Sequence, residues 1–177
     1  MINLRLRAAL ALAAVAAAFS FASSTASAAE ARVVLRGAQD YGAGTIVIRA
    51  REKKLYYMLG DGTAIRYPVA VAKHGKEWAG YARVNGKYLN PDWAPPSSVK
   101  RDHPELPNLI KGGSPRNPMG VAALTLDRDE IAIHGTNNKM RASVGTSASY
   151  GCIRMLNEDV RDLFSRVSVG TPVVMVY

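Results

Sequence analysis

Short runs of β-branched and aromatic residues, separated by turn residues, constrain the fold of this sequence most strongly. Thr45–Ala50 and Lys54–Leu59 are two such runs, and the glycines and aspartate at 60–62 form a hairpin signal before a third run, Ala64–Ala72. Pro68 lies within the third run and should split it or place it at a sheet edge, because proline cannot donate to a strand ladder. The pattern predicts an antiparallel meander.

Later runs extend the β prediction and add one helix. Val121–Leu126, Glu130–His134 and Pro172–Tyr177 are expected to be strands. Between them, Asn157 is a candidate helix cap, followed by apolar residues at helical spacing and ended by Gly170. We therefore expect a mainly β domain, a mixed sandwich or barrel-like sheet, with a short helix.

The first 28 residues have the organisation of a secretory signal peptide. Arg5 and Arg7 precede an apolar run of 14 residues, Ala8–Phe21, and Ala26–Ala28 forms an Ala-x-Ala cleavage site. A membrane anchor is the alternative, but spanning a bilayer takes about 20 apolar residues. We expect cleavage after Ala28, export to the periplasm and no stable membrane span afterwards.

The remaining chain is expected to hold a leader, residues 29–44, and one domain, residues 45–177. Residues 29–44 lack clear periodicity and contain three glycines. Without Arg5 and Arg7, 21 basic and 14 acidic residues remain, a net charge of about +7 that suits anionic wall polymers. Nucleic acid is not an expected partner, because no nucleic-acid motif accompanies the charge.

The segment Lys73–Gly120 is rich in proline and glycine, which predicts a long ordered loop that forms a binding site. Disorder is the alternative, but its tryptophans and tyrosines, such as Trp78 and Trp93, are anchors that disordered segments usually lack.

The single cysteine, Cys152, is the candidate nucleophile. It has no cysteine partner, and a thiol reacts usefully only when a base or a positive environment raises its thiolate fraction. His134 ends a predicted strand, and 17 intervening residues rich in small side chains allow Cys152 to return to it. His74 and His103 lie in the loop-rich segment and are expected to be surface residues.

The pair Gly151-Cys152 also suits an oxyanion site. Backbone N–H groups of Tyr150, Gly151 and Cys152 can point at one carbonyl oxygen, which predicts acyl transfer at a carbonyl substrate. An inert buried cysteine is the alternative. The histidines and the cysteine show no metal-ligand spacing, and acyl transfer between amides needs no cofactor.

Two motifs in order carry a family resemblance. His134–Thr136 (HGT), followed at this spacing by Ser149–Met155 (SYGCIRM), resembles the signature of the YkuD-type L,D-transpeptidase catalytic domain, and the similarity extends over residues 45–177. Residues 90–96 and 112–120 also resemble segments that precede the catalytic histidine in that family.

The resemblance implies that Cys152 attacks the carbonyl between diaminopimelate and the terminal D-alanine of a peptidoglycan stem tetrapeptide. His134 is then the general acid and base, oriented by the Gly135 carbonyl. Ser149, Tyr150, Gly151 and Arg154 are the implied oxyanion and substrate-binding residues, although Arg154 could equally be a structural clamp. The acceptor is the amine of a second stem, a lysine of an outer-membrane lipoprotein, or water. Carbapenems are expected to acylate Cys152.

The sequence departs from the family pattern at two places. Tyr150 replaces a histidine and supplies only a hydroxyl and a ring near neutral pH, and Glu77–Gly80 replaces a Thr-Pro-x-Gly turn. Two further hypotheses remain: an L,D-carboxypeptidase or amidase that uses water, and a non-catalytic wall-binding module with a decayed site.

Overall fold

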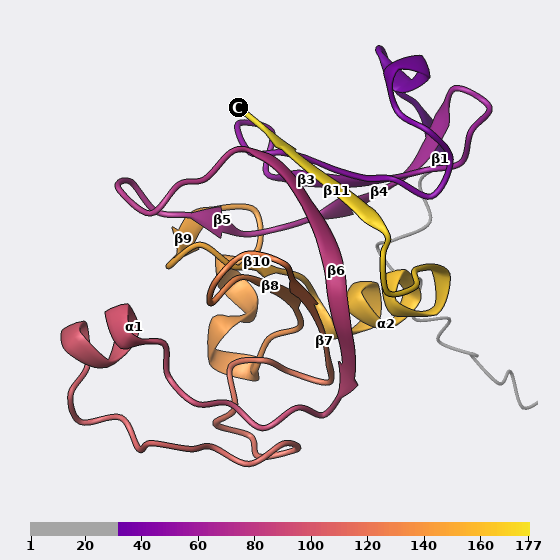
Figure 1. The fold of residues 1–177 in the computed structure, drawn as a ribbon. Coiled ribbons are helices and arrows are strands. Elements are labelled where there is room, and N and C mark those ends of the chain that lie inside the picture. Colours follow the sequence, from indigo (N-terminus) through magenta and orange to yellow (C-terminus); the bar gives the residue numbers. More distant parts are fainter. Residues whose placement is uncertain (1–31) are drawn as a thin grey trace, which may run out of the picture.

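One long strand, β6 (Gly80–Leu89), joins the two halves of the main sheet in the computed structural model, which describes residues 32–177 (Figure 1). Its first residues pair antiparallel with β11 (Pro172–Val176), and its later residues pair antiparallel with β7 (Ala122–Leu126). A register shift between Val84 and Gly86 lies where the partner changes. Bulges bend strands, so β6 passes from one half of the sheet to the other.

The predicted meander is confirmed in the first half. The nine-stranded sheet has the order β1-β4-β3-β2-β11-β6-β7-β8-β10, so β2, β3 and β4 are antiparallel neighbours and β11 lies parallel to β2. Their bounds are β1 Arg32–Val34, β2 Ile46–Arg49, β3 Lys54–Met58 and β4 Thr63–Pro68.

The third predicted run is split at its proline, as expected. β4 ends at Pro68, and β5 (Val71–Ala72) leaves the main sheet to pair with β9 (Ser147–Ser149) in a separate two-stranded sheet. The mainly β prediction is therefore correct, and the main sheet is open rather than a closed barrel.

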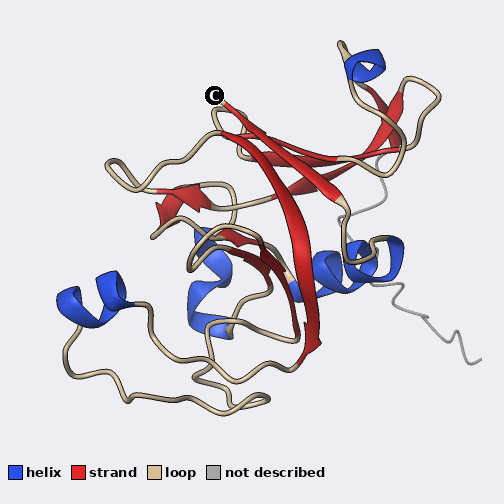
Figure 2. Cartoon of the chain, in the orientation of Figure 1, coloured by secondary structure: helices blue, strands red, loops and turns tan. Residues whose placement is uncertain are grey.

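The helix α2 (Asn157–Arg166) covers the second half of the sheet, where it contacts β7 and β8 (Ala132–His134) (Figure 2). Its Val160 and Leu163 side chains are fully buried in the same core as Ile48 and Leu55. Burying each such aliphatic side chain stabilises the fold by roughly 1.5–3 kcal/mol. The helix ends at Arg166, four residues before the predicted stop at Gly170.

The segment predicted to be loop-rich contains two regular elements. β6 lies within it, followed by the short helix α1 (Ser97–Asp102). In β6, buried Ala82, Val84 and Gly86 alternate with exposed residues. The inward positions are small, so the strand lacked the apolar signal that a sequence pattern detects.

The predicted leader also contributes to the structure. It forms β1 and a 3-10 turn, Ala38–Asp40, and Leu35 and Ala38 pack against the buried side chains of β2 and β3. The predicted signal peptide, residues 1–28, lies outside the described residues. Among residues 32–177, none of the helices has the length and apolar character that crossing a membrane requires.

Candidate active site

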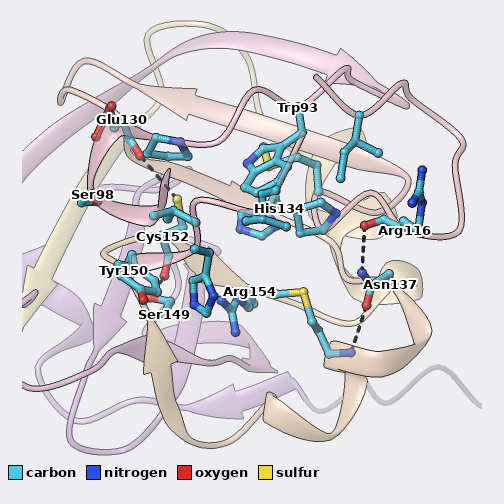
Figure 3. A pocket seen from close by; sticks show the side chains of 18 residues that line it. Trp93, Ser98, Arg116, Glu130, His134, Asn137, Ser149, Tyr150, Cys152 and Arg154 are labelled. Carbon is cyan, nitrogen blue, oxygen red and sulfur yellow. Dashed lines mark hydrogen bonds between the residues drawn. The ribbon is translucent and has the colours of Figure 1, made fainter. Parts of the chain in front are cut away.

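The register of two short parallel strands brings the predicted nucleophile and base to one cavity. In β8 and β10 (Ile153–Arg154), Ile153 pairs with Ile133 and Arg154 pairs with His134. Side chains alternate along a strand, so Arg154, His134 and Cys152, two residues before Arg154, share one face. All three line a cavity of about 310 Å³ (Figure 3).

The long segment 73–120 forms most of the wall of this cavity, as the sequence predicted for a binding loop. The residues of that segment that line it are Trp93, Pro96, Ser98, Val99, His103, Leu106, Ile110, Arg116, Pro118 and Met119. His103, expected to be a surface residue, is therefore half-exposed at the cavity, whereas His74 is fully exposed and pairs with Glu77. Apolar side chains and few charges make the cavity suitable for a peptide-like ligand.

His134 is buried and neutral. Its Nδ1 lies 2.7 Å from the Gly135 carbonyl, so we assign the tautomer in which Nδ1–H donates and Nε2 carries the lone pair. Burial, followed by the Arg154 charge, lowers the pKa of His134 to about 4, against the opposing effect of the Gly135 and Pro118 carbonyls. At neutral pH the ring is therefore unprotonated, and its Nε2 lone pair can accept a proton.

Cys152 is held as a thiol. Its Sγ lies 3.5 Å from the Glu130 carbonyl, to which the S–H group donates. Burial raises the pKa of the Cys152 thiol, while the Ala132 N–H and the Arg154 charge act in the opposite direction. The resting site therefore holds a neutral thiol and a neutral imidazole.

The turn before Cys152 is fixed by three hydrogen bonds. Ser149 Oγ donates to the Cys152 carbonyl at 2.6 Å and accepts from the Gly151 N–H at 3.2 Å. The Gly151 carbonyl accepts from Trp78 Nε1 at 2.9 Å. Gly151 has φ 127°, and a Cβ there would lie 2.6 Å from Ile131 Cδ1, so only glycine fits.

This geometry corrects the predicted oxyanion site. The Gly151 N–H is already engaged by Ser149, and Ser149 is fully buried with its hydroxyl committed to the turn. Gly151 is not among the residues that line the cavity, whereas Ser149, Tyr150 and Cys152 are. The N–H groups of Tyr150 and Cys152 remain as the candidate donors.

Arg154 is a partly buried cation that faces the cavity. Its guanidinium donates to Ser143 Oγ at 3.4 Å, and the ion pairs formed within residues 32–177 do not include it. Its backbone N–H and carbonyl form hydrogen bonds with Ala70. Burial lowers the pKa of the guanidinium, which nevertheless stays charged. A free, desolvated arginine suits a carboxylate ligand.

Asn157 has a different role from the predicted helix cap. Leu156 occupies the cap position, and Asn157 is the first helical residue. Its Oδ1 accepts from the Thr136 N–H at 3.1 Å and from the Val121 N–H at 3.4 Å. A Cβ on Gly135 would lie 2.3 Å from that oxygen. Asn157 thus fixes the chain immediately after His134.

A second cavity of about 600 Å³ is also lined by Cys152, together with the charged residues Asp127, Arg128, Asp129 and Glu130. The residues that line both cavities are Trp93, Pro96, Met119, Glu130 and Cys152. Within residues 32–177, histidine, cysteine and carboxylate side chains form no group of three that could hold a metal ion.

The sequence did not identify Trp78 or Glu130 as site residues. Glu130 was expected within a strand, but it has φ 57° in the turn before β8, and its carbonyl therefore reaches the Cys152 thiol. Trp78 was recognised only as an aromatic anchor, since its contact with Gly151 spans 73 residues of chain.

Known proteins resemble this chain in sequence over most of its length. It is 37% identical over 137 residues to the probable L,D-transpeptidase YbiS of Escherichia coli, covering 72% of this chain and 43% of the relative. It is 34% identical over 140 residues to the probable L,D-transpeptidase ErfK/SrfK of E. coli, covering 74% and 43%. The chain spans less than half the length of these relatives.

Solved structures share the fold. An L,D-transpeptidase from Mycobacterium smegmatis superposes with a TM-score of 0.60 at 16% identity, covering 75% of this chain and 58% of that one. L,D-transpeptidase 3 from Mycobacterium tuberculosis gives a TM-score of 0.60 at 15% identity, covering 76% and 61%. The model of the YkuD family, the L,D-transpeptidase catalytic domain, matches residues 43–175. This chain belongs to that family.

Proposed function

We propose that this chain is an exported cysteine acyltransferase of the periplasm that acts on peptidoglycan stem tetrapeptides as an L,D-transpeptidase. The observation that carries the proposal is the register of β8 and β10, which directs the side chains of Cys152, His134 and Arg154 towards one cavity. A nucleophile, a base and an anion-binding group are the parts that acyl transfer from a carboxylate-bearing peptide needs.

The first step joins Cys152 Sγ to the carbonyl carbon between diaminopimelate and D-alanine. Because the thiol and the imidazole are both neutral at rest, the thiol proton passes to His134 Nε2 as the sulfur attacks. The N–H groups of Tyr150 and Cys152 receive the developing oxyanion. His134 then returns the proton to the leaving amine, the C–N bond breaks, and D-alanine departs from a thioester.

The Gly135 carbonyl supports this cycle by holding His134 Nδ1–H, so that only Nε2 exchanges protons. Arg154 binds a carboxylate of the donor stem, because it faces the cavity and has no ion-pair partner within residues 32–177. Because Arg154 lines the first cavity, we assign that cavity to the donor stem.

We assign the second cavity to the acceptor. Cys152 lines it as well, and its three acidic residues, Asp127, Asp129 and Glu130, outnumber its one basic residue, Arg128, which favours a cationic amine. The ammonium first loses one proton to solvent, and the neutral amine then attacks the thioester carbonyl. His134 takes a second proton from the amine and passes it to the departing sulfur, so that the C–S bond breaks, the thiol is restored and the new amide remains. The acceptor is the diaminopimelate amine of a second stem in cross-linking, or a lysine when a lipoprotein is attached.

The test incubates the chain with disaccharide tetrapeptide and follows the products by mass spectrometry, beside Cys152→Ala as the matched control. We expect a cross-linked dimer with D-alanine release in the wild type alone. D-alanine release without dimer would replace the transpeptidase with a hydrolase. No turnover by a folded wild type would overturn the acyltransferase and favour a wall-binding module.

A second test uses a β-lactam in place of the stem. The solved relatives include a mycobacterial enzyme with a faropenem-derived adduct and one in complex with imipenem. We expect intact-mass analysis to show one imipenem adduct on the wild type and none on Cys152→Ala. An adduct on the alanine variant would contradict the assignment of the nucleophile.

A further inference from the structure

The side chain of Tyr150, at the position where the family resemblance expects histidine, reaches away from Cys152 to the end of α1. Its hydroxyl donates to Asp102 Oδ2 at 2.7 Å, and Asp102 is the last residue of α1. The two residues are 48 positions apart in the sequence. The contact therefore joins the turn that carries the nucleophile to the long loop that encloses the cavity.

Charged groups reinforce this contact. Lys73 Nζ lies 3.6 Å from the centre of the Tyr150 ring and 3.8 Å from Asp102 Oδ2. Lys76 lies 5.9 Å from the same ring, and His103 packs edge-on against it with centres 6.5 Å apart. The Tyr150 hydrogen bond, supported by Lys73, lowers the pKa of Asp102, so the acceptor stays ionised.

The other end of α1 is also tied to the neighbourhood of Cys152. The Ser97 N–H donates to Glu130 Oε1 at 2.9 Å, and the Glu130 carbonyl accepts from the Cys152 thiol. Two side chains close to the nucleophile thus hold the two ends of one short helix.

Packing alone does not hold α1. None of its six residues is buried, and it stands out from the sheet on a long connection (Figure 1). Segments with few buried contacts open at low free-energy cost, so polar contacts at the helix ends have a large share in keeping it in place.

The helix nevertheless forms part of the cavity wall. Ser98 and Val99 of α1, with His103 and Leu106 after it, line the same cavity as Cys152, and Figure 3 shows Tyr150 beside Cys152 in that cavity. A displacement of α1 would therefore change the shape of the donor side without touching the thiol or the imidazole.

We propose that Tyr150 is a positioning residue whose hydroxyl, through Asp102, holds α1 as the cavity wall against which the donor peptide binds. A phenol is a neutral hydrogen-bond donor, whereas an imidazole changes its charge within the physiological pH range. The donor identity rests on the proposed function, whereas the latch between Tyr150 and α1 stands on the contacts alone.

Hydrogen–deuterium exchange tests the latch without any substrate. In Tyr150→Phe, which removes only the hydroxyl, we expect amides of residues 97–106 to exchange roughly three- to tenfold faster, in line with the loss of one typical, solvent-exposed hydrogen bond. Asp102→Asn should act in the same direction, and the double variant should add little. Tyr88→Phe, an exposed tyrosine on β6, is the matched control. Unchanged exchange at 97–106 in Tyr150→Phe would overturn the latch.

Steady-state kinetics test the consequence for binding. We expect Tyr150→Phe to raise the KM for the tetrapeptide by roughly three- to tenfold, with kcat within about twofold. A fall in kcat at unchanged KM would overturn the positioning role and place Tyr150 in the chemistry. If the wild type shows no turnover, the proposed function fails while the exchange experiment still decides the latch.

A histidine variant separates this role from simple packing. In Tyr150→His, an imidazolium can pair with Asp102 at pH 6, but the neutral ring at pH 8 pairs weakly. We expect a KM near that of the wild type at pH 6 and near that of Tyr150→Phe at pH 8. Lys73, Lys76, His103 and Asp102 face residue 150 in every variant, so Tyr150→Phe measured at both pH values controls for pH effects that do not come from residue 150. A pH-independent KM in Tyr150→His would overturn the proposal.

Discussion

The two halves of the main sheet bury different kinds of side chain. We call strands β2, β3, β4 and β11 the apolar half. Within residues 32–177, the only buried polar or charged residue in or next to these strands is Thr45, immediately before β2. The site half comprises β7, β8, β10, the turn at 149–152 and the segments that contact them, including α2. It buries the polar residues Asn117, His134, Thr136, Ser149 and Asp159.

The difference separates stability from function. Apolar burial stabilises a fold directly, whereas a buried polar group costs free energy unless it is hydrogen-bonded. Two residues of the site half violate that requirement: Thr136 Oγ1 and both carboxylate oxygens of Asp159 have no hydrogen-bond partner within residues 32–177. Substitutions in the apolar half should therefore change stability alone, and those in the site half should also change chemistry.

Leu55→Ala should give the largest effect on stability. Leu55 is fully buried in the core, and removing its side chain leaves a cavity that typically costs about 2–5 kcal/mol. We expect the free energy of unfolding, measured by urea denaturation, to fall by that amount, and the rate at which imipenem acylates the folded fraction to stay unchanged. Leu89→Ala, a leucine that is 65% exposed, is the control and should change stability by less than about 0.5 kcal/mol. A similar loss of stability in Leu55→Ala and Leu89→Ala would contradict the assignment of stability to the buried side chains of the apolar half.

The pH dependence of stability should have opposite signs at two residues of the site half. The pKa of His134 is lowered from 6.5 to about 4, so unfolding binds a proton between these values and acidification destabilises the fold by about 3 kcal/mol in total. Burial raises the pKa of Asp159 from 3.8 to about 6, so unfolding releases a proton there and acidification stabilises the fold. The two effects nearly cancel between pH 6 and pH 4.

Single variants should expose each effect. Relative to the wild type, acidification from pH 6 to pH 4 should change the free energy of unfolding more favourably in His134→Gln and less favourably in Asp159→Asn. Urea unfolding at both pH values measures each slope, and the double variant should return to the slope of the wild type. Equal slopes in the two single variants would show that these residues are not the titrating pair.

Trp78→Phe should lower both stability and reactivity. It keeps a ring but removes the donor to the buried Gly151 carbonyl, at a cost of about 1–3 kcal/mol, and frees the turn before Cys152. We expect a lower rate of imipenem acylation by intact mass. Tyr67→Phe is the matched control, because it also removes one hydrogen bond from a buried ring, and neither Tyr67 nor its partner Asp162 in α2 lines either cavity. It should lower stability without slowing acylation; slower acylation there would erase the distinction between the halves.

The sequence predicted the apolar half better than the site half, and the reason is physical. Large apolar side chains and local turns identify β2, β3 and β4 in the sequence. In contrast, β6 buries Ala82, Val84 and Gly86, whose small side chains give little alternation of apolar and polar residues. In the site half, Cys152 and His134 were found from residue chemistry and motif spacing. Trp78 and Glu130 were missed, and Asn157 was wrongly expected to cap its helix, because their partners lie far away in the sequence.

The smallest expected effect concerns the charge that shares the cavity with His134. The Arg154 charge lowers the pKa of His134, although burial is the larger cause. Arg154→Met keeps the length and removes the charge, so the pKa of His134 should rise yet remain below its ordinary value, because the ring stays buried. Arg154→Lys should keep it depressed. An NMR titration measures all three histidines, and His74 and His103, exposed and half-exposed, serve as internal references. A rise of equal size in the methionine and lysine variants would mean that packing, not charge, sets the basicity of His134.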